Sequence, residues 1–397
     1  MLLRRGATAC CEISGSGWEN PGRPRCQAPP DLVGYSHRVM TADSVADAGG
    51  RPGGPPEPLP GQLALPGLEP EPADEDGQYL LPGMEDVSGQ AGQGNEDPER
   101  DRVAAALRAA DPDGLLLAAA LRRAFDLLLD GQHTGRYRWD QLHKTEKTHA
   151  GTLVEIGLQR TFGLADGTAL DYSIAGVEVD CKFSQRSGGW MIPPEAEGHL
   201  LLLVQASDDE GTWSAGLVRA RDAYLTEAGN RDLKRTLNDA GRGAIEWLAW
   251  HALLPDNALL RLPERDTAAI LGCATGQQAV NELFRRALGR RISRAVVATV
   301  ARQEDYMKRV RGGGGARDQL RGEGIVIFGD YAGHQALAAA LGLPSPGPGE
   351  FVSARLARRG ERAARSAAQR YVRLDGADWV LAQTAAGTGP APRLPRT

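Results

Sequence analysis

The pattern of apolar and polar positions separates the first quarter of the chain from the rest. Residues 1–99 are rich in Pro, Gly and acidic residues, contain few aromatic residues, and show no regular spacing of apolar positions. Such a segment cannot bury enough apolar surface to offset its ordering entropy, and we expect it to be disordered. From about residue 100 onward apolar residues recur at regular spacing, and there we predict that the folded part begins.

The first part of the patterned region predicts helices. Apolar residues recur at helical spacing in 101–110, in 113–131 and in about 148–162. The second of these helices is predicted to begin near Asp113 and to end at Gly131, because Asp and Gly are common at helix starts and ends respectively. A polar loop separates this helix from the third.

β-Rich runs follow these helices. Two runs between residues 170 and 184 meet at Ala175-Gly176, where the turn chemistry suits a hairpin. Runs at 199–207 and 212–220 are also predicted strands, and the first is apolar almost throughout, as in a central strand. Residues 221–254 are predicted to be helical. Together these elements predict an α/β domain at 100–252.

The remainder of the chain predicts a second domain, at 273–397. Two prolines mark 253–272 as a linker or arm. The pattern then predicts a helix from 276, a turn near Gly289 to Ile292, and a second helix from about Ser293 to Arg311. A loop and a pair of strands are predicted next. A helix-turn-helix followed by a strand pair is a winged-helix pattern, and the helix-turn-helix is typical of DNA-binding proteins.

Charge is distributed unevenly along the chain. The formal net charge is −5, but residues 41–100 carry 13 acidic and 2 basic residues. From residue 255 to the end there are 22 basic and 13 acidic residues, a local charge of +9. Positive charge gathered at one end suggests a polyanionic partner, although a solvated face is the commoner explanation for any single charge run.

Cysteine usage and the lengths of the apolar runs indicate the compartment. The five cysteines form no CxxC pair, and three of them lie in the first 30 residues. This pattern argues against a disulfide framework and a zinc site and favours a reducing cytoplasm. No apolar run reaches about 18 residues, so we expect no transmembrane helix. Since the N-terminus also lacks an apolar signal core, we expect a soluble, cytoplasmic protein with no membrane partner.

Charged residues interrupt the apolar run of the predicted hairpin. Asp171 begins its first strand, and Asp180 and Lys182 lie on its second. Side chains two residues apart on a strand point to the same side, and Asp171 can reach them across the hairpin. Magnesium prefers oxygen ligands, typically one or two carboxylates. The two aspartates, with the backbone carbonyl of Cys181, therefore predict a magnesium site where Lys182 contacts an attacking water or a phosphate.

An acidic residue two positions before a lysine is a weak signal by itself. The same spacing occurs at Asp232 and Lys234, in a polar stretch where a solvated helix face is the simpler interpretation. For Asp180 and Lys182 the alternative is a structural buried ion pair, which is costly without further partners. Only 5 of the 46 basic residues are lysines, and a lysine whose pKa shifts readily suits water activation better than arginine does.

Further basic residues are candidates for contact with DNA. Lys144 and Lys147 precede the third predicted helix, and they either hold phosphate or lie in a solvated loop. Between Arg285 and Arg321 there are 11 basic and 3 acidic residues. Candidates there for contact with the DNA backbone or major groove are Arg291, Arg294, Arg302, Lys308, Arg309 and Arg311.

The block from residue 130 to 185 resembles a known nuclease family. The segments TLVEIGLQRTFG at 152–163 and ALDYSIAGVEVDCKFSQ at 169–185 are similar to the PD-(D/E)xK nuclease core. With DGQHTGRYRWDQLHKTEKTHAG at 130–151 they resemble the NaeI-type restriction endonucleases. The resemblance covers roughly 100–385, although Val179 stands where the generic motif name has proline.

The resemblance implies a fold, a site and a mode of action. It implies a restriction-endonuclease-like mixed sheet flanked by helices, followed by a C-terminal helix-turn-helix DNA-binding domain. Glu155 is implied to join Asp171, Asp180 and Lys182 in one magnesium site. The implied enzyme is a homodimer that binds two copies of a palindrome such as GCCGGC, one of them as an effector. We expect it to cleave both strands and to leave 5′-phosphates.

Three hypotheses for function therefore remain open. The leading one is a type II, two-site restriction endonuclease. The second is a repair endonuclease of the mismatch-repair type, which would nick one strand. The third is a winged-helix DNA-binding regulator whose nuclease fold is inactive, and the intact set of Asp171, Asp180 and Lys182 counts against it.

Overall fold

The structure is a computed structural model that describes residues 96–227, 232–361, 370–385 and 388–395. The predicted disorder of 1–99 lies, up to residue 95, outside the described residues. Helix α1 (Pro98–Ala110) begins the folded part, and the Asp97 carboxylate caps it by accepting a hydrogen bond from the Arg100 N–H at 3.1 Å.

Three further helices lie between α1 and the first sheet. Helix α2 (Leu115–Leu129) is followed by the single turn α3 (Gly131–Thr134) and by α4 (Lys144–Phe162). Helix α4 begins four residues before the predicted start at 148. The reason is a local cap, because the Glu146 carboxylate accepts a hydrogen bond from the His143 N–H at 2.8 Å.

Six strands form the first sheet, in sequence order from one edge to the other. They are β1 (Ala165–Asp166), β2 (Tyr172–Ile174), β3 (Val177–Ser184), β4 (Leu200–Ser207), β5 (Thr212–Arg219) and β6 (Glu246–Leu253). Strands β3 and β4 run parallel and the other neighbours run antiparallel, so the sheet is mixed. The predicted hairpin is present, and Ala175 and Gly176 both adopt positive φ, as a two-residue hairpin turn requires.

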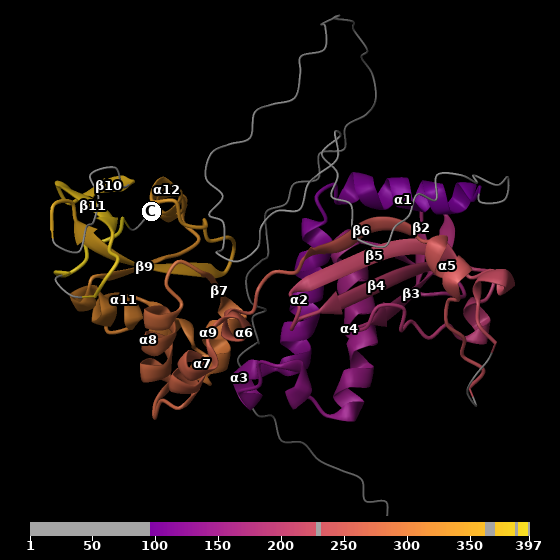
Figure 1. Ribbon diagram of the computed structural model, residues 1–397, viewed down its shortest axis with the longest axis horizontal. Coiled ribbons are helices and arrows are strands. Elements are labelled where there is room, and N and C mark those ends of the chain that lie inside the picture. Colours follow the sequence, from indigo (N-terminus) through magenta and orange to yellow (C-terminus); the bar gives the residue numbers. More distant parts are fainter. Residues whose placement is uncertain (1–95, 228–231, 362–369, 386–387, 396–397) are drawn as a thin grey trace, which may run out of the picture. The chain divides into compact units, whose positions relative to one another are not determined.

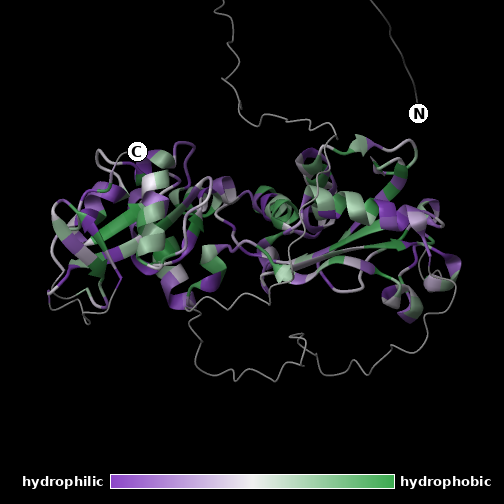
Figure 2. Ribbon diagram, turned by 90° about the horizontal axis from the view of Figure 1, so that it is seen from above, coloured by the Kyte–Doolittle hydropathy of each residue, from purple (hydrophilic) through white to green (hydrophobic). Residues whose placement is uncertain are grey.

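Apolar side chains cover both faces of this sheet. On one face α1, α2 and α4 pack against alternate residues of the strands, including Val179 and Cys181 of β3 (Figure 1). On the other face Trp190 and Ile192 pack against Leu201 and neighbouring residues. Figure 2 shows the strands as predominantly hydrophobic. This α/β arrangement of a mixed sheet flanked by helices agrees with the predicted class.

The helical prediction for 221–254 is wrong. That segment contains the short turn η3 (Asp222–Tyr224), the short helix α5 (Asp239–Gly243) and the strand β6. Strand β6 satisfies its backbone by pairing with β5, a long-range interaction that apolar spacing along the segment does not reveal. Asp232 and Lys234, which have the same spacing as Asp180 and Lys182, are interpreted from the sequence as a solvated helix face. They lie outside any helix, and Leu233 between them has a φ of 56°.

The five strands of the second sheet gather around a long central strand. They are β7 (Arg291–Ser293), β8 (Ile325–Phe328), β9 (Glu350–Arg358), β10 (Tyr371–Leu374) and β11 (Ala377–Leu381). Strand β9 pairs with β7, β8 and β11, and all pairings are antiparallel. The helices of this part are α6 (Ala258–Arg261), α7 (Glu264–Leu271), α8 (Gly276–Arg286), α9 (Arg294–Ala301), α10 (Met307–Val310), α11 (Ala316–Gln319) and α12 (Ala332–Ala340).

The second half of the chain differs from its prediction in three ways. The segment predicted as a linker contains α6 and α7, whose Leu259 and Ile270 pack into the core around α8. The second helix of the predicted helix-turn-helix stops at Ala301, because Arg302 adopts a left-handed conformation. The strand pair predicted directly after that helix is wrong, because β8 pairs with the distant β9, beyond α12.

Across the described residues, no helix is both long enough and apolar enough to cross a membrane.

Candidate active site

The hairpin brings the two predicted aspartates together. Tyr172 pairs with Val179, and this antiparallel register, extended by one residue, sets Asp171 opposite Asp180. The Asp171 carboxylate accepts a hydrogen bond from the Cys181 N–H at 2.7 Å. The short turn and the period of the strand therefore produce the juxtaposition that the sequence predicted.

Strand β3 separates its apolar residues from its charged ones. Val179 and Cys181 point into the core beneath the helices, whereas Asp180 and Lys182 lie on the opposite side of the strand. The Lys182 Nζ atom lies 2.5 Å from Asp180 Oδ2 and donates a hydrogen bond to the Cys181 carbonyl at 3.2 Å. The ammonium group therefore bridges the two oxygens that we predicted as cation ligands.

The Asp180 carboxylate is nearly enclosed. Burial raises its pKa, while Lys182 lowers it and Asp171 raises it. The buried Oδ2 atom of Asp180 is compensated by the Lys182 ammonium, which contacts it at 2.5 Å. Two carboxylates and one carbonyl form a donor set that fits the preferences of magnesium.

Glu155 approaches the same cluster from α4. Burial raises its pKa, and so do the negative charges of Asp171 and Asp180, whereas Lys182 lowers it. These interactions place Glu155 within electrostatic range of all three residues. The Tyr172 hydroxyl donates a hydrogen bond to the Glu155 carbonyl at 2.8 Å, which ties this turn of the helix to β2.

The carboxylates of Glu155, Asp171 and Asp180 do not lie close enough together to form a group of three metal ligands. Within the part of the chain that the structure describes, no three His, Cys, Asp or Glu side chains lie close enough together to hold one metal ion. Magnesium commonly takes only one or two protein carboxylates and completes its shell with water and substrate phosphate. That Glu155, Asp171 and Asp180 share one ion therefore stays a prediction.

Glu178 is a residue of this site that the sequence reasoning missed. Its carboxylate accepts hydrogen bonds from the N–H groups of Thr168, Ala169 and Leu170, at 2.7, 3.1 and 3.0 Å. These bonds lower the pKa of Glu178 and fix the loop that leads into Asp171. The available signal was alternation, since Glu178 precedes Asp180 by two residues and lies on the same side of the strand.

The predicted DNA-contacting residues fall in two places. Lys144 and Lys147 lie in the first turn of α4, the former exposed and the latter partly so. The other six lie between residues 291 and 311, and all are at least partly exposed: Arg291, Arg294, Arg302, Lys308, Arg309 and Arg311. The Arg309 Nε atom already donates to the Gln303 side-chain oxygen at 2.7 Å. Contact of these residues with DNA stays a prediction.

Comparison with known proteins identifies the family. Residues 101–388 match the family described as Restriction endonuclease NaeI, and this match covers more than half of the chain. The chain belongs to the NaeI restriction endonuclease family. The Type II restriction enzyme NaeI of Lentzea aerocolonigenes is 49% identical over 308 residues, which are 76% of this chain and 95% of that protein.

Membership in the NaeI restriction endonuclease family bears on three predictions. The predicted family is confirmed, and so is the predicted enzyme class, a type II site-specific deoxyribonuclease. The mixed sheet with its flanking helices fits a restriction-endonuclease-like fold. The hairpin cluster at Asp171, Asp180 and Lys182 lies inside the matched residues.

Proposed function

We propose that this member of the NaeI restriction endonuclease family is a magnesium-dependent enzyme that cleaves both strands of DNA at a specific sequence. The observation that supports the proposal is the hairpin cluster. There Asp171 and Asp180 lie opposite each other, and Lys182 contacts Asp180. A phosphodiester repels nucleophiles through its own negative charge, so its hydrolysis needs positive charge at the phosphate and an oriented water.

The residues of the hairpin cluster have different roles in this hydrolysis. Asp171, Asp180 and the Cys181 carbonyl would hold the ion, and Glu155 would orient groups around it from α4. Magnesium, when bound, supplies positive charge that polarises the scissile phosphate. The Lys182 ammonium contacts the attacking water or the phosphate, as a compact charge with three donors can.

The oligomeric state, the target sequence and the domain roles are inferred from the family resemblance and from the positive charge of the C-terminal part. We infer a cytoplasmic homodimer that binds two copies of a GC-rich palindrome such as GCCGGC and leaves 5′-phosphates. Residues 100–252 would form the endonuclease domain and residues 273–397, with α6 and α7 packed on their core, a winged-helix-type DNA-binding domain, in which α8 and α9 form the helix-turn-helix. The positive charge of this second part supports contact with the DNA backbone.

Digestion of a supercoiled plasmid of known sequence, followed by sequencing of the ends, tests the proposal. We expect linear products with 5′-phosphates in magnesium and none when a chelator removes the ion. A plasmid that carries one copy of the site should be cut more slowly than one that carries two. Products that stop at the open-circle form would favour the nicking hypothesis. Sequence-specific binding without any cleavage would favour the regulator.

Cleavage is expected to fall as the pH is lowered through the raised pKa values of Asp180 and Glu155. Burial raises the pKa of both carboxyl groups. They therefore take up protons at a higher pH than ordinary carboxyl groups do, and a protonated group binds a cation poorly. Activity is thus present above the raised pKa and lost below it. Single-turnover rates at subsaturating magnesium measure this, and an acid limb at the ordinary carboxyl pKa of about 4 would contradict it.

Glu178→Ala is expected to raise the magnesium concentration for half-maximal cleavage by about 10- to 100-fold, the usual effect of losing a residue that orients a metal ligand. The variant loses three hydrogen bonds to the loop before Asp171, so the carboxylate of Asp171 is no longer held in place. Glu195→Ala is the matched control, because Glu195 is an exposed acid on the connection between β3 and β4. An equal effect of both changes would contradict the positioning role.

A further inference from the structure

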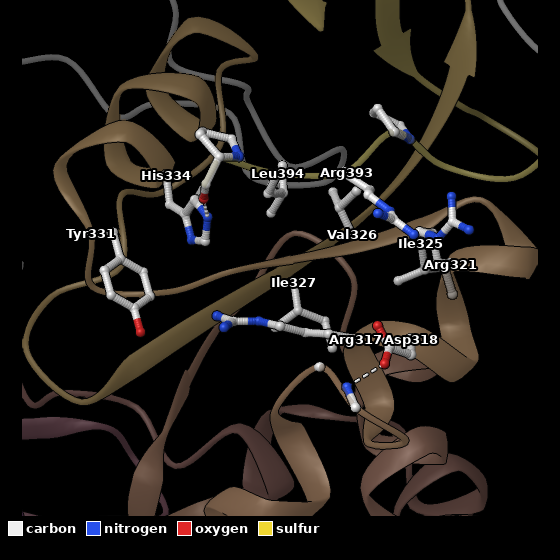
Figure 3. A pocket seen from close by; sticks show the side chains of 14 residues that line it. Arg317, Asp318, Arg321, Ile325, Val326, Ile327, Tyr331, His334, Arg393 and Leu394 are labelled. Carbon is white, nitrogen blue, oxygen red and sulfur yellow. Dashed lines mark hydrogen bonds between the residues drawn. The ribbon is translucent and has the colours of Figure 1, made fainter. Parts of the chain in front are cut away.

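A second concave site lies in the C-terminal part, on elements other than the hairpin cluster. A cavity of about 610 Å³ is lined by α11, the turn after it, β8, the start of α12 and the segment 392–395 (Figure 3). Cavities of about 300–1,000 Å³ commonly accept small molecules. None of the lining residues belongs to the predicted nuclease site or to the predicted DNA-contacting set.

Arg317 carries a charge into this cavity without a partner of opposite sign. Its Nε atom is buried and makes no hydrogen bond, and no ion pair joins it to a carboxylate of the described chain. Its guanidinium is directed toward Tyr331, with the guanidinium carbon 5.9 Å from the ring centre (Figure 3). Burial lowers the pKa of Arg317, although an arginine stays protonated. A buried guanidinium nitrogen without an acceptor is costly, which indicates a site shaped for an anionic ligand.

The other titratable groups that line the cavity leave it positive. Arg321 and Arg393 add two positive charges, at the other end from the Arg317 guanidinium (Figure 3). Asp318 is the one acid among the lining residues, and its carboxylate accepts hydrogen bonds from the N–H groups of Gly313 and Gly314.

His334 adds no positive charge to the lining. Burial lowers its pKa, and its Nδ1 accepts a hydrogen bond from the Gly329 N–H at 3.0 Å. Its Nε2 pairs with the Pro395 carbonyl at 2.9 Å and must donate, because the carbonyl can only accept. Three arginines therefore face one aspartate and a neutral histidine.

Apolar side chains contribute to the lining between the two cationic ends. Ile325, Val326 and Ile327 of β8 all line the cavity, but side chains alternate along a strand, so Ile325 and Ile327 pack into the core around α8 and Val326 lies on the side of Leu394 (Figure 3). Apolar groups beside positive ones suit a ligand that combines a flat apolar ring with an anion. Arginine's planar fork matches the oxygens of a phosphate group, which can accept two hydrogen bonds from it.

We propose that this cavity binds a nucleotide-sized phosphomonoester, with its phosphate at Arg317 and its ring beside Val326 and Leu394. The buried position of the Arg317 Nε atom favours a small ligand, or a molecule that ends there, over the continuous backbone of a duplex. The site would be separate from the hairpin cluster, and the proposal does not depend on the proposed cleavage chemistry.

Calorimetric titration of the whole protein with adenosine 5′-monophosphate tests the proposal. We expect saturable binding with a Kd below about 1 mM, weaker binding of inorganic phosphate and no binding of adenosine. Covalently closed plasmid, which has no strand ends, should not displace the nucleotide. Displacement by that plasmid, equal binding of adenosine, or no saturable binding of the nucleotide would each overturn the proposal.

Variants of Arg317 separate a binding role from a structural one. Arg317→Met is expected to weaken nucleotide binding at least about tenfold, as loss of a charge-assisted hydrogen bond does. Its ligand-free Tm should equal or exceed that of the wild type, because the change removes a buried Nε donor that has no acceptor. Arg290→Gln is the matched control, since Arg290 is exposed and lies outside the cavity, and it should bind as the wild type does. Wild-type affinity in Arg317→Met, or a large fall in its Tm, would overturn the proposal.

Discussion

Asp180→Ala is expected to abolish DNA cleavage while leaving DNA binding intact. The change removes a buried carboxylate that faces Asp171 and contacts Lys182, and with it the main support for a cation. Charge stabilisation by a metal ion is worth several kcal/mol, and each 1.36 kcal/mol is tenfold in rate. The single-turnover cleavage rate should therefore fall at least about 10³-fold, while gel-shift affinity for the same duplex stays at the wild-type value.

A second aspartate in the chain, Asp232, provides the control for Asp180→Ala. Asp232→Ala removes an acid with the same spacing to a lysine, Lys234, but from an exposed position outside the hairpin. It should cleave at the wild-type rate. Lys182→Met should lose cleavage and keep DNA binding, as Asp180→Ala does. Cleavage at the wild-type rate by Asp180→Ala would refute the assignment of the site.

The second large effect concerns stability. Asp208→Ala is expected to lower the free energy of unfolding by about 3 kcal/mol, the low end for breaking a buried ion pair from one side, because Asp126 still pairs with Arg122 at 3.0 Å. Asp208 and Arg122 are 2% and 6% exposed, and two hydrogen bonds of 2.5 and 3.0 Å join the guanidinium to the carboxylate. The pair ties α2 to the turn between β4 and β5. Urea denaturation followed by circular dichroism measures the loss.

An exposed ion pair gives the contrast. Asp239 pairs with Arg242 at 2.5 Å, but the Asp239 side chain is 98% exposed. Solvent screens such pairs, and their loss costs little. Asp239→Ala should therefore unfold at the wild-type urea concentration. If Asp208→Ala were equally harmless, the buried pair would not hold α2 to the sheet.

The hairpin of the site was predictable because every step in its logic is local. A two-residue turn at Ala175-Gly176 fixes the register of β2 against β3, and the register sets Asp171 opposite Asp180. The period of two along β3 then puts Lys182 on the side of Asp180. Neither inference needs a distant partner, and both agree with the structure.

The two errors that concern strands share one cause, which is pairing over long distances in the chain. Apolar residues near 246–253 are compatible with a helix, and only the open edge of β5 makes them a strand. Strand β8 finds its partner in β9, beyond the intervening helix α12, and not in the next residues of the chain. The loop-fixing role of Glu178 and the unpaired charge of Arg317 were hidden for the same reason, since both depend on which neighbours the folded chain provides or withholds.

By itself, then, the sequence determined the helices around α2 and α4 and the hairpin with its acidic pair and lysine, and its resemblance to known nucleases indicated the family. The helices and the hairpin rest on spacing within about 20 residues, which sterics and side-chain periodicity translate directly into geometry. Only the tertiary structure decided that β6 closes one sheet edge, that β9 forms the centre of the second sheet, and that Arg317 faces a cavity without forming an ion pair. Backbone pairing and burial are properties of neighbours in space, and a chain can bring together many different neighbours with the same local pattern.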